Sequence, residues 1–150
     1  MKSIFDKKVT AEIIGRIEQL TATTQPKWGK MSVGQMLAHC NVTYEMVYDD
    51  IHPKPGAFTK FLLKLFVKKA VLSDKPYKHN GQTAPAFKIT DPRDFELEKS
   101  RLIDYITKTQ QLGGSFFNGK ESHSFGELKE SEWNAMFYKH LDHHLSQFGV

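Results

Sequence analysis

Four stretches of the sequence place apolar residues at intervals of three and four, and this helical period constrains the fold more than any other feature. They cover residues 9–20, 33–47, 91–112 and 131–148. Strand signals are weak throughout the chain. The pattern predicts an all-α protein, in which the four helices form an antiparallel bundle with one additional short helix.

Local signals mark where two of these helices begin. Ser32 is followed three residues later by Gln35, the spacing of a capping box at a helix N-terminus. Asp91 precedes Pro92, and this order predicts an N-cap followed by proline at the first helical position. Gly113 follows the last apolar residue of that third helix and is expected to end it.

The segment 58–72, FTKFLLKLFVKKAVL, is the most apolar in the chain and has a lysine at every fourth position from Lys60 to Lys68. It is too short to cross a bilayer, which needs about 20 apolar residues. The sequence favours a crossover helix packed on the body of the domain. A helix on a membrane surface, a surface that binds a partner and a homodimer contact are the alternatives.

Composition limits the class of protein and its partners. The chain has 150 residues, 39% of them hydrophobic and 25% charged, which predicts a single folded domain over residues 1–150. Basic and acidic residues are interleaved and the net charge is only +4, so we expect no nucleic-acid partner. Cys40 is the one cysteine, and the N-terminal residues show no secretory signal. We therefore expect a cytoplasmic protein.

The last predicted helix contains three histidines within five residues, His140, His143 and His144. At 100° per residue, His140 and His144 share the apolar face with Trp133 and Phe137, while His143 projects to one side. Imidazoles at positions i and i+4 can bind one metal ion together. They can also be hydrogen-bonded core residues, which is the alternative to a metal site.

A metal site needs at least one further ligand from elsewhere in the chain. His39 is the best candidate, because it lies beside the apolar stripe of the second helix and helices of a bundle meet in the core. His123, just before the last helix, is a candidate fourth ligand. His52 and His79 are flanked by proline, lysine and asparagine, so we interpret them as surface residues.

Two stretches in combination resemble a known group of proteins. MSVGQMLAHC on the second helix and HSFGELKESEWNAMFYKHLDHHLSQF at the C-terminus are similar to the DinB/YfiT-like superfamily, over about residues 28–148. The resemblance implies an up-down-down-up four-helix bundle with a divalent-metal site between helices. It places the metal ligands at His39, His140 and His144. Members of that superfamily include thiol-dependent transferases, isomerases and hydrolases.

These observations suggest an enzyme that uses a divalent metal ion, zinc or nickel, and acts on a small molecule. The reaction is either hydrolysis or thiol transfer, and in the second case the substrate is a low-molecular-weight thiol. His143 and His123 are the candidates for proton transfer, since both can lie near the three ligands. Two alternatives stay open. One is a metal- or ligand-binding bundle without catalysis, and the other is a peripheral membrane or partner-binding protein that uses residues 58–72.

Overall fold

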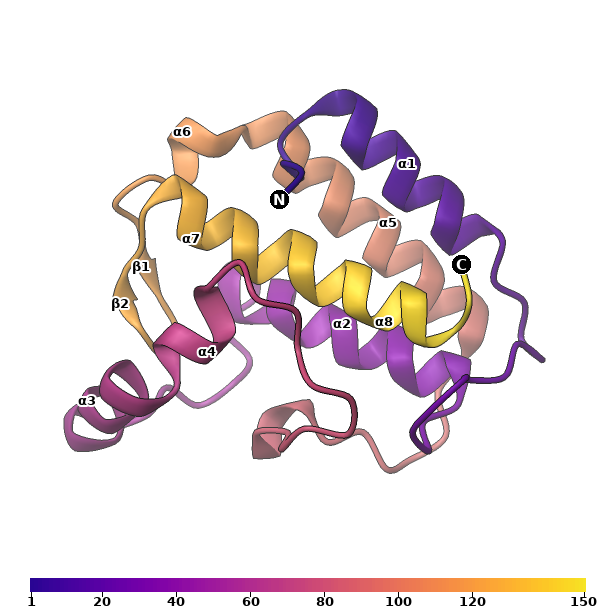
Figure 1. Ribbon diagram of the computed structural model, residues 1–150, viewed down its shortest axis with the longest axis horizontal. Coiled ribbons are helices and arrows are strands. Elements are labelled where there is room, and N and C mark those ends of the chain that lie inside the picture. The colour runs from indigo at the N-terminus through magenta and orange to yellow at the C-terminus, as the bar shows by residue number, and fades with distance from the viewer.

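The computed structural model describes residues 1–150, and its long helical segments lie side by side along the long axis of the molecule (Figure 1). These segments are α1 (Lys7–Glu18), α2 (Val33–Tyr48), α5 (Phe95–Leu112) and a continuous C-terminal helix made of α7 (Glu130–Asn134), the π-helical turn η2 (Ala135–Lys139) and α8 (His140–Gln147). The predicted all-α class is confirmed. No helix combines the length and the apolarity needed to cross a membrane.

Shorter elements fill the connections between the long helices. They are α3 (Ala57–Phe66), α4 (Lys68–Leu72), the 3₁₀ turn η1 (Pro85–Phe87), α6 (Gly114–Phe117) and a two-stranded antiparallel sheet of β1 (Glu121–Ser122) and β2 (Gly126–Glu127). The single helix expected over 58–72 is interrupted at Val67, where the α3 and α4 segments meet.

One apolar core joins the long helices. The α2 helix packs against α5 and α8, and α1 packs against the same two helices. Ile17 of α1, Leu37 of α2, Leu102 of α5 and Phe137 of the C-terminal helix are each at most 1% exposed. The apolar stripes read from the sequence therefore face this shared core, and burying them is the main favourable term in folding.

The two predicted helix starts have different outcomes. The capping box at Ser32 is confirmed, since its hydroxyl accepts from the Gln35 amide and the Gln35 side chain accepts from the Ser32 amide. The prediction for Asp91 is wrong, because α5 begins after Asp94, whose carboxylate accepts from the Leu97 amide at 2.8 Å. Asp91 instead pairs with Arg93, and its carbonyl accepts from the Gln35 side chain.

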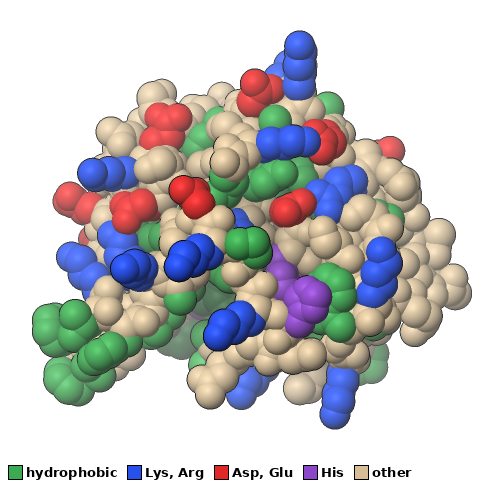
Figure 2. Space-filling view, viewed as in Figure 1, with side chains coloured by type: hydrophobic (Ala, Val, Ile, Leu, Met, Phe, Trp, Pro, Cys, Tyr) green, Lys and Arg blue, Asp and Glu red, His purple; other side chains and the backbone are tan.

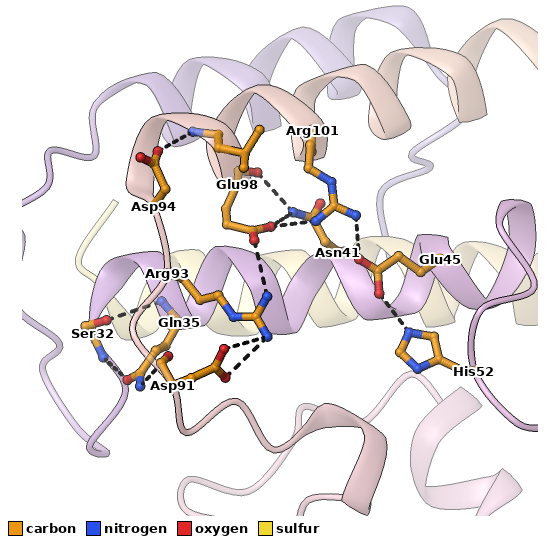
Figure 3. A network of polar contacts seen from close by, with 11 residues as sticks. Ser32, Gln35, Asn41, Glu45, His52, Asp91, Arg93, Asp94, Glu98 and Arg101 are labelled. Atoms are coloured by element: carbon orange, nitrogen blue, oxygen red, sulfur yellow. Dashed lines mark hydrogen bonds and ion pairs between the residues drawn. The ribbon is translucent and has the colours of Figure 1, made fainter.

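A buried polar network joins α2 to α5 away from the apolar core (Figure 3). Arg101 of α5 donates to the carboxylates of Glu98 and Glu45 at 2.9 and 2.6 Å. Asn41 of α2 donates to the Glu98 carboxylate, and Glu45 also pairs with His52 at 2.7 Å. Because two buried carboxylates would be costly without partners, the network fixes the register of α2 against α5.

Replacing the α2 cap should weaken the helix that contributes His39. We expect Ser32→Ala to lower the free energy of unfolding by about 1 kcal/mol, since one amide at the helix start loses its acceptor. Urea unfolding followed by circular dichroism measures this change. Ser100→Ala, at an exposed position inside α5, is the control and should leave stability within about 0.5 kcal/mol of wild type. Equal effects of the two substitutions would contradict the role of the cap.

Candidate metal centre

Three histidines from two helices converge where α2 crosses α8. His39 lies on α2, and His140 and His144 lie one turn apart on α8. The Nε2 atoms of His39 and His140 are 2.9 Å apart, and the potential ligand atoms of all three residues lie within 4.8 Å of one another. Two nitrogens bound to one tetrahedral zinc ion lie about 3.3 Å apart, given Zn–N distances of about 2.0–2.1 Å. The cluster therefore has dimensions that fit one metal ion.

Hydrogen bonds on the outer side of the rings determine which nitrogen faces the cluster. His39 Nδ1 donates to the Phe87 carbonyl at 2.8 Å, because a carbonyl only accepts. His144 Nδ1 donates to the Gln147 side-chain oxygen, also at 2.8 Å. The Gln147 amide is oriented by its own donation to the Trp28 carbonyl at 2.7 Å. Both neutral rings therefore carry their proton on Nδ1 and leave the Nε2 lone pair directed inward.

His140 has a hydroxyl partner on its outer side, with Thr43 Oγ1 3.0 Å from its Nδ1. A cluster without a metal can use this group: Thr43 then donates to His140, and His140 Nε2 donates to His39. That arrangement satisfies two rings but gives Nε2 of His144 no hydrogen-bond partner. A cation at the centre, by contrast, is a partner for all three inward nitrogens. The geometry thus allows one metal ion to be held by all three histidines.

The environment keeps the three imidazoles neutral. Burial lowers the pKa of His144 to about 3, with a further contribution from His39. Burial also lowers the pKa of His39, and it lowers that of His140 well below the ordinary value, assisted by the neighbouring histidines. A metal ligand must be deprotonated, so at neutral pH the cluster is already in the ligating form.

The segment between α4 and α5 covers the cluster with two aromatic rings. The Phe87 ring lies 5.3 Å from that of His39 and 5.8 Å from that of His140, between centroids. Tyr77 lies 6.5 Å from His140 in the same measure. The contact of this loop with the histidines was not predicted, because no periodic pattern in a sequence reports a long-range loop contact.

The π-helical turn η2 ends immediately before His140 and is anchored by Lys139. The ammonium of Lys139 donates to the carbonyls of Ala70, Ser73 and Lys75, the shortest at 2.6 Å. Inserted π turns are found mostly at functional sites, since they rotate the residues that follow. Here the turn sets the direction in which α8 presents its two histidines.

His143 lies beside the cluster, at the edge of a cleft of about 370 Å³. Its ring is 5.0 Å from that of His144 and 5.6 Å from that of Tyr77. The cleft also contains Trp28 and the exposed His79, whose rings stack at 3.8 Å. Figure 2 shows histidine side chains reaching this face of the molecule between hydrophobic ones. Because it lies between the cluster and the cleft, His143 remains a candidate for proton transfer.

The structure does not bring His123 to the cluster. Its ring contacts the Ser124 hydroxyl at 2.9 Å and the His52 carbonyl at 3.4 Å, in the turn between β1 and β2. It is not part of the group of potential ligands, so this geometry does not support it as a fourth ligand. His52 is half-buried and paired with Glu45 rather than free on the surface.

A comparison with protein families places the chain in one of them. The family model described as "Protein of unknown function (DUF1569)" matches residues 5–149, nearly the whole length. The chain belongs to the DUF1569 family. The same comparisons found no matching curated protein and no matching solved structure.

The buried histidines should make this DUF1569 protein sensitive to acid when it is free of metal. The His144 pKa is about 3 in the folded protein and about 6.5 when unfolded, so between these values only the unfolded state binds the proton. Stability from this residue is therefore present above pH 6.5 and lost as the pH falls. We expect protonation of His144 in the unfolded state to lower the free energy of unfolding by about 2 kcal/mol between about pH 7 and pH 5.

Urea unfolding of chelator-treated protein at the two pH values measures this loss. A His144→Gln variant should lose less stability than wild type over the same interval. The exposed His79 supplies the control, since His79→Gln should keep the full pH dependence. The account fails if the His144→Gln and His79→Gln variants respond to pH alike.

Proposed function

We propose that the protein is a divalent-metal-dependent enzyme that acts on a small molecule, by hydrolysis or by thiol transfer, with His39, His140 and His144 as the metal ligands. One observation supports this proposal above all others. The three inward nitrogens share one space, while each outer nitrogen has its own hydrogen-bond partner. Such partners on the far side of ligating imidazoles are typical of metal sites in proteins.

The number of ligands favours catalysis over a structural role. Structural zinc sites are normally closed by four protein ligands, whereas catalytic sites have three and keep a position for water or substrate. Only three ligating side chains meet here. When bound, a divalent ion supplies Lewis acidity, which activates a water molecule or a thiol as nucleophile. Imidazole ligands suit zinc, nickel, copper and iron alike, and zinc or nickel is the proposed ion.

The residues around the cluster have separable tasks. Phe87 and Tyr77 limit the access of water to one side, which strengthens electrostatic interactions at the centre. The cleft beside His143 has room for a small molecule, and of the histidines near the cluster only His143 and His79 line it. His143 can accept or donate a proton there, because it faces the cleft and lies next to a ligand without being one.

We also propose that the chain shares the up-down-down-up four-helix bundle of the DinB/YfiT-like superfamily. The packing of α1, α2, α5 and the C-terminal helix supports this assignment. So does the arrangement of one histidine on the second long helix and two, one turn apart, on the last.

Alanine variants of two neighbouring histidines, His143 and His144, distinguish a role in metal binding from a role in catalysis. We expect purified wild type to bind one zinc or nickel ion per chain, and His144→Ala to lose it because a ligand is removed. His143→Ala should keep the metal. Isothermal titration of chelator-treated protein measures binding, and panels of esters, amides and thiol-acceptor pairs measure turnover. Turnover that requires the metal and falls in His143→Ala would support the enzyme. Full metal loading without turnover on any panel would favour a metal-binding bundle without catalysis.

The outer hydrogen bond of His144 gives a finer test. Gln147→Leu should weaken metal affinity by about 10- to 100-fold, because His144 loses the acceptor that orients its ring. Ser146→Ala, at the adjacent exposed position, should bind like wild type. Equal affinities for Gln147→Leu and Ser146→Ala would show that the outer bond has no role in ligation.

A further inference from the structure

The α3 helix exposes its apolar side to solvent instead of burying it. None of its residues is buried, and Phe58 and Phe66 are 75% and 72% exposed. The large side chains that face outward are Phe58, Phe61, Leu62, Leu65 and Phe66. Figure 2 shows them as a hydrophobic cluster at the corner of the molecule where Figure 1 places α3. This cluster of five side chains is called the α3 patch below.

Helical geometry shows that the patch is a continuous face. At 100° per residue, its five side chains occupy an arc of roughly 140°. Leu63 and Val67, which pack against the core, lie on the other side. The helix is therefore attached to the protein by a narrow apolar strip and presents its wider apolar face outward. An exposed, contiguous face of this kind marks an interaction site, since monomeric soluble proteins rarely expose large apolar patches.

Charge around the patch identifies the kind of partner. From Ile51 to Ser73 the sequence has five lysines and no aspartate or glutamate; the lysines are Lys54, Lys60, Lys64, Lys68 and Lys69. Lys54, Lys60 and Lys68 are paired with carboxylates outside this segment, whereas Lys64 and Lys69 are exposed and form no ion pair. A second copy of the chain docked through this segment would bring two sets of lysines together. An anionic surface, in contrast, is attracted by them.

We propose that α3 docks onto an anionic phospholipid surface. The helix lies in the plane of the interface, with the α3 patch inserted at the boundary between headgroups and acyl chains. Lys64 and Lys69, the two unpaired lysines, contact the lipid headgroups. Aromatic rings suit this depth, and lysine side chains reach outward from it to the phosphates. The helix of ten residues does not span the bilayer. This inference rests on α3 alone and is independent of the metal centre.

Flotation with vesicles of phosphatidylcholine, with and without phosphatidylserine, tests the proposal on the full-length chain. Wild type should bind the vesicles that contain phosphatidylserine and should be released from them by high salt, because salt screens the lysines. The double variant Phe58→Ser/Phe66→Ser should reduce binding by about tenfold or more, since it removes two inserted rings. The charge variant Lys64→Glu/Lys69→Glu should reduce it to a similar degree.

Leu97→Ser is the control, since Leu97 is an apolar residue on α5 that is 58% exposed and lies outside the α3 patch. It should float like wild type, and all variants should unfold at the wild-type temperature because none of these side chains is buried. Failure of wild type to bind phosphatidylserine vesicles at low salt would overturn the proposal. So would equal binding of wild type and Phe58→Ser/Phe66→Ser. Dimerisation in solution that this double variant abolishes, without vesicle binding, would assign the α3 patch to a second copy instead.

Discussion

The burial of three imidazoles at one helix crossing is the constraint on which the rest of the structure depends. Polar rings removed from water need a partner for each nitrogen, or they lower stability. On the outer side the partners come from three separate parts of the chain: the Phe87 carbonyl, the Thr43 hydroxyl and the Gln147 amide. On the inner side the potential ligand nitrogens lie within 4.8 Å of one another. In the proposed metal centre, a shared cation is the partner of all three.

Much of the remaining polar structure holds the two crossing helices in place. The Glu45, Glu98 and Arg101 network fixes α2 against α5 and leaves the face that contains His39 directed at α8. On the other side, Lys139 ties the π-helical turn to the carbonyls of Ala70 in α4 and of Ser73 just after it. Rigid supports of this kind are what a site needs if its ligands are to keep their geometry. The cleft with its stacked Trp28 and His79 is lined by Lys139 of this support and by His143.

The sequence predicted what depends on local pattern and failed where tertiary contacts decide. Helical periods gave the all-α class, and the capping box gave the start of α2. The i, i+4 pair and His39 were correctly brought together as potential ligands, since helices of a bundle bury their apolar faces against one another.

The start of α5 was misplaced, because Asp91 lies outside the helix and instead pairs with Arg93 and accepts from Gln35. Neither the loop contact of Phe87 nor the position of His123 has any local signal. An exposed apolar face over 58–72 was only the alternative to a helix packed on the body of the domain, because amphipathicity alone does not say which way a helix faces.

Crystallography with anomalous scattering tests the metal centre most directly. Crystals of the protein soaked in zinc or nickel salt should give one strong anomalous peak at the absorption edge of the added metal. This peak should lie between the Nε2 atoms of His39, His140 and His144, with each Nδ1 still bonded to its present partner. A peak elsewhere, or none at the three histidines at saturating metal, would contradict the proposed metal centre and leave the three residues as a hydrogen-bonded part of the core.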